Sequence, residues 1–92
     1  MRLGPNNYKT SALINSGASA CFLDEKFARC HRISLIQKTK PVHVEVIDGR
    51  SLFSGDVIHE TFSVDVVING HSSCVIFNII RSPSNPVILG LS

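Results

Sequence analysis

Apolar and polar residues alternate along most of the chain, as expected for strands that bury one face. The alternation is clearest over residues 42–47, Val-His-Val-Glu-Val-Ile, and over 61–68. Further strands are predicted from shorter apolar stretches at 12–14, 51–58 and 86–91. The pattern therefore predicts an all-β domain.

Two dipeptides predict tight turns between these strands. Asp48-Gly49 separates 42–47 from 51–58, and Asn69-Gly70, which suits a type I′ turn, precedes a strand predicted over 73–80. Apolar residues occupy both faces of 73–80, which predicts a central position in a sheet. Gly55, inside an apolar stretch, predicts a bulge or a close backbone approach.

Only one short helix is predicted. Asp24 suits an N-cap, Glu25 follows it in the first turn, and the basic residues His31 and Arg32 stand where the helix would end. The helix has two turns at most. Residues 1–10 are expected to be an N-terminal tail or edge strand, and residues 11–92 the folded domain.

Size and charge limit the classes of function. A chain of 92 residues with a net charge of +2 predicts one domain with a limited core and a weak surface field. We expect no nucleic-acid partner, although a small barrel that binds nucleic acid through Arg32, Lys38 and Lys40 is a minor alternative. The chain has neither an apolar stretch of about 18 residues nor a signal peptide, so we expect no membrane partner and a cytoplasmic location.

Cysteine and histidine give no sign of a metal or cofactor site. The three cysteines form no C-x-x-C pair, and the four histidines are scattered. We therefore expect no metal and no cofactor, and we interpret the cysteines as buried or half-buried reduced thiols.

Residues 12–25, Ala-Leu-Ile-Asn-Ser-Gly-Ala-Ser-Ala-Cys-Phe-Leu-Asp-Glu, contain the strongest candidate motif. A nucleophile elbow is excluded because Cys21 stands where its second glycine belongs and no long helix follows. A phosphate-binding loop would need more glycines and a Lys-Ser/Thr pair. An apolar strand followed by Asn-Ser-Gly-Ala, and Val-Ile-Leu-Gly-Leu about seventy residues later, resembles the retropepsin-like aspartic proteases, especially those of gypsy-class retrotransposons and their domesticated vertebrate descendants.

The resemblance implies a closed β-barrel or sandwich with one half-site per chain, acting as a homodimer. In the family, each chain supplies an Asp at the position of Asn15, and the two carboxylates share a proton because like charges push their pKa values apart. Ser16 would link the two turns across the dimer, and Gly17 would allow their close approach.

The resemblance also implies a substrate site for an extended peptide or polyprotein. The hairpin of residues 44–58 would be the flap that closes over the peptide, which binds by strand addition. The implied peptide-contacting residues are Ala18, Val46, Ile47, Asp48, Gly49 and Ile88.

Asn15 and the chain ends depart from the family pattern. A carboxamide cannot act as a general base, so we predict that the Asn15 form is silent, whether the residue is engineered or natural. The family's C-terminal helix and strand are missing before Ser92, which predicts a weak dimer. The alternative is a domesticated, non-enzymatic module that dimerises or holds a peptide.

Overall fold

The computed structural model describes residues 1–4, 8–15, 20–48, 51–82 and 85–90 of the chain. In these residues the sequence forms short strands and one helix, which confirms the predicted all-β class with a single short helix. The elements are β1 (Arg2–Leu3), β2 (Tyr8–Lys9), β3 (Leu13–Asn15), β4 (Phe22–Asp24), α1 (Glu25–Cys30), β5 (Leu35–Asp48), β6 (Ser51–Thr61), β7 (Val64–Ile68), β8 (His71–Val75), β9 (Asn78–Ile80) and β10 (Val87–Gly90).

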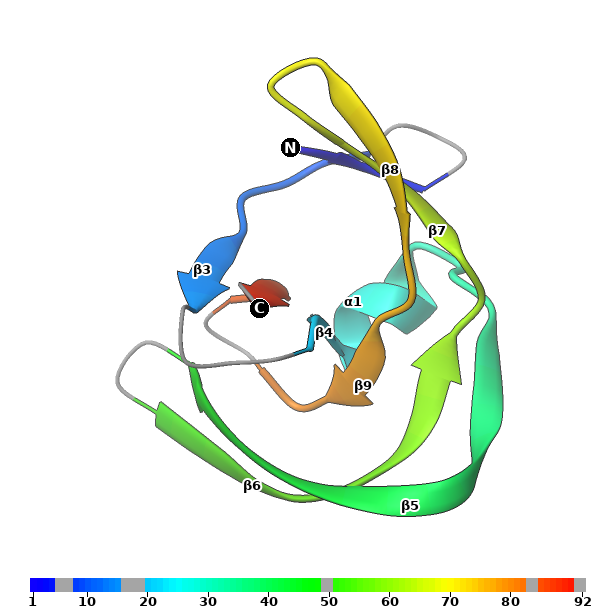
Figure 1. The fold of residues 1–92 in the computed structure, drawn as a ribbon, viewed down its shortest axis with the longest axis vertical. Helices are drawn as coiled ribbons and strands as arrows, with labels where there is room; N and C mark the ends of the chain where they lie inside the picture. Colours follow the sequence, from blue (N-terminus) through cyan, green and yellow to red (C-terminus); the bar gives the residue numbers. More distant parts are fainter. Residues whose placement is uncertain (5–7, 16–19, 49–50, 83–84, 91–92) are drawn as a thin grey trace.

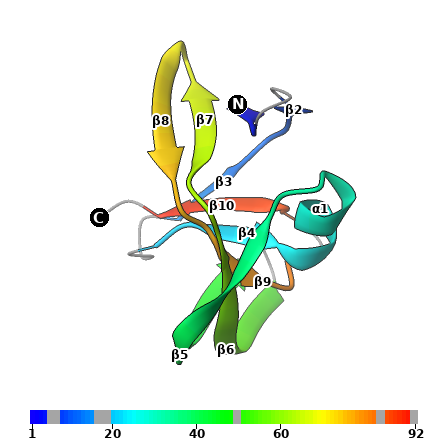
Figure 2. The ribbon, with the colours of Figure 1, turned by 90° about the vertical axis from the view of Figure 1, so that its right-hand side faces the viewer.

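The strands form two open sheets. The smaller has the order β2-β1-β7-β8, and the larger has the order β3-β10-β4-β9-β6-β5. Figure 1 shows the long β5–β6 hairpin curving around one end of the molecule, while β7 and β8 project from the other end. In the side view of Figure 2, β4 and β10 lie between these two ends. The described pairing leaves edge strands in both sheets and closes no barrel.

The β5–β6 hairpin contains an irregularity on β5. Gln37 pairs with His59 and Val42 with Val57, so residues 38–41 lie opposite residue 58 alone. Pro41 falls in this segment and has no N–H to give to the ladder. Gly55, by contrast, pairs in regular register with Val44, so the predicted bulge at Gly55 is wrong.

The second hairpin has the predicted turn. Asn69 and Gly70 both have positive φ, 49° and 79°, as a type I′ turn requires, and β7 and β8 pair on either side of them. However, β8 is the exposed edge of the smaller sheet, so the central position predicted for 73–80 is wrong there. The chain leaves this sheet after Val75 and enters the larger one as β9, which is central. Apolar residues on both faces therefore reflect a change of sheet.

Side chains cover both faces of the larger sheet at its centre. Neighbouring residues of a strand point to opposite faces, so β4, β9 and β10 each contribute to two apolar clusters. The main cluster consists of Leu3, Leu23, Ala28, Val64, Val66, Phe77, Ile79, Val87 and Leu89. The hairpin cluster consists of Phe22, Val46, Val57, Ile80 and Ile88.

The described part of the chain has no helix able to cross a bilayer, because α1 has only six residues.

A buried threonine fixes the point where the chain changes sheets. Thr61 is fully buried at the end of β6; its N–H donates to the Phe77 carbonyl at 2.9 Å, and its Oγ1 accepts from the Phe77 N–H at 3.0 Å. We predict that Thr61→Val lowers the free energy of unfolding by about 1–3 kcal/mol, because the Phe77 N–H loses its acceptor in a buried place. Urea unfolding of Thr61→Val beside Thr39→Val, an exposed threonine on β5, measures this; equal effects would contradict it.

Candidate active site

Strand β10 organises the segment that carries the sequence motif. β3 lies parallel to β10, with Leu13 opposite Ile88 and Asn15 opposite Gly90. β4 lies antiparallel on the other side of β10, with Phe22 opposite Ile88. The two ends of the motif are therefore held on opposite sides of one strand, although they are close in sequence.

Asn15 is the last residue of β3, which is an edge strand of the larger sheet. Its backbone lies beside Gly90 of the Val-Ile-Leu-Gly strand, so the structure brings together the two motifs that the sequence separates by about seventy residues. The Asn15 side chain lies outside the described residues, as do Ser16, Gly17 and Ala18.

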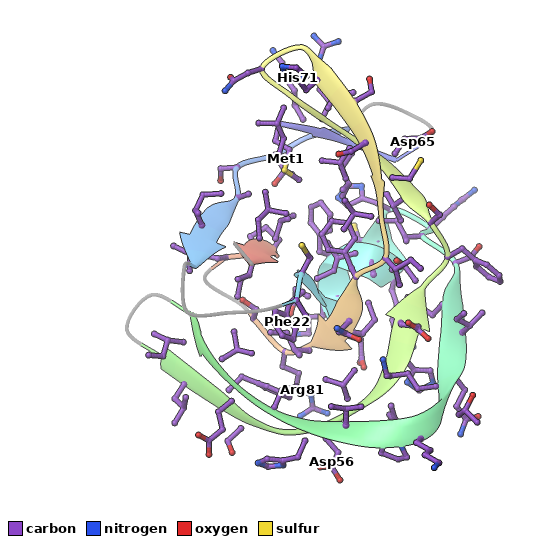
Figure 3. The ribbon with its side chains drawn as sticks, viewed as in Figure 1. Met1, Phe22, Asp56, Asp65, His71 and Arg81 are labelled. Atoms are coloured by element: carbon purple, nitrogen blue, oxygen red, sulfur yellow. The ribbon has the colours of Figure 1, made fainter. Side chains whose placement is uncertain are left out.

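The outer part of the β5–β6 hairpin packs against one face of the central strands β4 and β10. Val46 is only 2% exposed and packs in the hairpin cluster with Phe22 and Ile88, two of the residues that flank the motif. Figure 3 shows Phe22 between the central strands and the hairpin. The hairpin is therefore closed on the core in the single chain.

The predicted peptide-contacting residues fall in different environments. Val46 and Ile88 are brought together but are both buried, whereas Ile47, on the opposite face of the hairpin, is 59% exposed. Asp48 ends β5 opposite Ser51, and its side chain lies outside the described residues, as does Gly49. Val46 and Ile88 are therefore covered in this structure and offer no surface to a partner.

Asp24 links the elements around the site. Its Oδ2 accepts from the Phe27 N–H at 3.2 Å, which confirms the predicted helix cap, and its Oδ1 accepts from the Ser82 N–H at 2.7 Å. The Asp24 N–H also donates to the Pro86 carbonyl at 2.8 Å. One residue thus joins α1 to the segment between β9 and β10. The sequence indicated only the cap, since no local spacing points to a contact 58 residues away.

Two further acids and two of the three cysteines lie on the surface. Asp56 on β6 is exposed beside His43, and Asp65 on β7 is exposed beside Cys74. Cys21 is half-buried, but Cys30 and Cys74 are exposed, so the expectation of burial is wrong for these two. Cys30 ends a surface helix and Cys74 lies on an edge strand. The described residues contain no group of three His, Cys, Asp or Glu that could hold a metal.

Strand β10 lies between the motif strand β3 and its return strand β4, and the long β5–β6 hairpin packs over them. This is the arrangement that the resemblance to retropepsin-like proteases leads us to expect. The comparison with protein families agrees, because residues 11–92 match the model of the PEG10/RTL1 protease domain. The chain therefore belongs to this family of domesticated gypsy retrotransposon retropepsin-like proteases. No solved structure matches the chain significantly.

The contacts of Asp24 lead to a stability prediction. We expect Asp24→Ala to lower the free energy of unfolding by about 1–3 kcal/mol, because the helix loses its cap and the Ser82 N–H loses its carboxylate acceptor. Asp56→Ala is the matched control, since Asp56 is exposed and meets only His43 among its described polar contacts; we expect less than about 0.5 kcal/mol there. Thermal melts of the two variants measure the difference, and equal shifts would rule out the linking role.

Proposed function

We propose that this chain is one half of a homodimeric aspartic endopeptidase domain in which Asn15 replaces the catalytic acid, so that the fold remains but cleavage is lost. The carrying observation is the position of Asn15, at the end of β3 and opposite Gly90. Membership of a retropepsin-like family supports the assignment of that position to the catalytic residue.

The chemistry of the amide explains the proposed loss of cleavage. The family reaction needs one carboxylate to take a proton from water while the other donates a proton to the peptide carbonyl. A carboxamide does neither at useful pH. Loss of general acid–base catalysis typically lowers a rate by about 10²–10⁴, and here both chains lose the group.

Exposed apolar residues support the proposed dimer. Ile14, next to Asn15 on the edge strand, is 53% exposed, and the directly paired Ile47 and Leu52 near the turn of the hairpin are also largely exposed. Figure 1 shows this end of the hairpin on the same side of the molecule as β3. Retropepsin-like proteases act as dimers on polypeptide substrates. In our proposal, the second chain binds on the side of β3 and the hairpin turn, and the two half-sites together form the active site.

A second candidate is a non-enzymatic module that dimerises or holds an extended peptide. Asn15 itself favours this candidate, because a chain with Asn at this position keeps the fold without the catalytic acid. Both proposals use the same surface and the same hairpin, and they differ in whether the rest of the site still supports cleavage once an acid is present.

The dimer prediction follows from the exposed residues around Asn15. We expect the chain to dimerise weakly, with a Kd of about 1 µM or higher, because the contact surface that we propose among the described residues is limited to β3 and the hairpin. Ile14→Asp should raise the Kd at least tenfold by placing a charge in the interface, whereas Phe62→Asp, at another exposed apolar position, should leave it unchanged. Sedimentation over a concentration series decides; a monomer at millimolar concentration would refute the dimer.

Asn15→Asp separates the two candidate functions. If the site is otherwise intact, we expect the Asp form to cleave extended apolar peptides at acidic to neutral pH and to be inhibited by statine-type transition-state mimics. A dimeric Asp form with a closed hairpin that cuts nothing across a peptide library would favour the non-enzymatic module.

The same pair of variants predicts a pH-dependent stability difference. In the Asp dimer, like-charge repulsion raises the pKa of one carboxyl above its value in the unfolded chain. The Asp form should then gain stability relative to the Asn form as the pH falls toward that raised pKa, and lose it at neutral pH, where both groups ionise. Melts of both forms at pH 5 and 7.5 measure the difference; parallel changes would contradict a shared site.

A further inference from the structure

The β5–β6 hairpin has a narrow attachment to the rest of the larger sheet. Among the described residues, the only strand pairing between β6 and β9 is Glu60 opposite Asn78. Next to this pair, Thr61 exchanges two hydrogen bonds with Phe77. From Val42 and Val57 outward, the hairpin is held to the core by the side chains of the hairpin cluster.

One lysine crosses this attachment. Lys38 belongs to β5, the outermost strand, yet its Nζ lies 3.0 Å from Oδ1 of Asn78 on β9 and 3.8 Å from Oε2 of Glu60 on β6. The Lys38 and Glu60 side chains are only 19% and 27% exposed, so solvent screens the contact less than it screens a surface pair. A hydrogen bond from an ammonium group is stronger than a neutral one. A single amine therefore joins three strands.

Lys38 lies at the point where the pairing between β5 and β6 is interrupted. Lys38 is the first residue of the irregular segment 38–41, where four residues of β5 lie opposite one residue of β6. Bending at a gap in the ladder breaks fewer backbone hydrogen bonds than bending within regular pairing. The amine is thus placed where the hairpin can hinge at the lowest cost.

We propose that Lys38 is a positioning residue that fastens the base of the β5–β6 hairpin to β9 and so sets how often the hairpin opens above Phe22 and Ile88. Any effect of Lys38 on catalysis rests on the proposed function, in which this hairpin is the flap. Lys38 touches no expected substrate position and acts through the hairpin.

Hydrogen exchange measured by mass spectrometry tests the fastening on the chain as it is. In Lys38→Met, peptides covering 42–57 should lose about tenfold in protection, which corresponds to the loss of one hydrogen bond to a charged group, while peptides covering β4 and β10 keep theirs. Lys40→Met is the matched control, because Lys40 is an exposed lysine two residues along the same strand. Lys38→Arg retains charge and donors and should restore part of the protection.

Either of two exchange patterns in the lysine variants would overturn the proposal. One is an equal loss of protection in Lys40→Met, and the other is a loss spread evenly over hairpin and core, which would mean that Lys38 supports only global stability. If Lys38→Met fails to fold, Asn78→Ala carries the test, since it removes the 3.0 Å bond and leaves the Lys38–Glu60 pair. A hairpin-specific loss in Asn78→Ala supports the proposal, and unchanged exchange in the hairpin overturns it.

An activity measurement separates this inference from the proposed function. In an Asn15→Asp background, Lys38→Met should raise KM several-fold with a smaller change in kcat, because the hairpin closes over the peptide less often. If the hairpin responds in exchange but the Asp form cleaves nothing, the fastening stands and the protease proposal fails. If cleavage occurs but exchange and KM are unchanged in Lys38→Met, the fastening fails and the protease proposal stands.

Discussion

The sharing of β10 between β3 and β4 is the constraint on which the rest of the structure depends. The backbone of this strand pairs with both neighbours, and its side chains alternate between the two clusters, with Ile88 on one face and Val87 and Leu89 on the other. A strand of three apolar residues ending in Gly90 is suited to a place that is covered on both faces. Displacing it would uncouple the two ends of the Asn15 motif and open both clusters at once.

Local patterns predicted much of the fold because they are governed by local physics. The Asn69-Gly70 turn follows from the two positive φ angles that a type I′ turn needs, and the Asp24 cap follows from the free N–H groups at a helix start. The break between Val75 and Asn78 was not predictable in this way. Alternation describes which residues are apolar, and it does not say which of two sheets covers them.

The candidate site shows the same division between local and distant information. The pairing of Asn15 with Gly90 agrees with the motif order in the sequence, but the burial of Val46 and Ile88 depends on how far the hairpin has closed. The contacts of Lys38 with Asn78 and of Asp24 with Ser82 join residues 40 and 58 positions apart. Such pairs have no signature in a single sequence, because either partner is an ordinary surface residue until the chain has folded.

The packing of the hairpin on the core bears on whether the fold stays stable in a chain that does not cleave peptides. Val44, Val46 and Phe53 rest on the apolar residues of the half-site, so a solitary chain shields that surface from water and from other chains. A chain without proteolytic activity would therefore not expose this apolar surface, and exposed apolar surface is a common cause of aggregation and degradation.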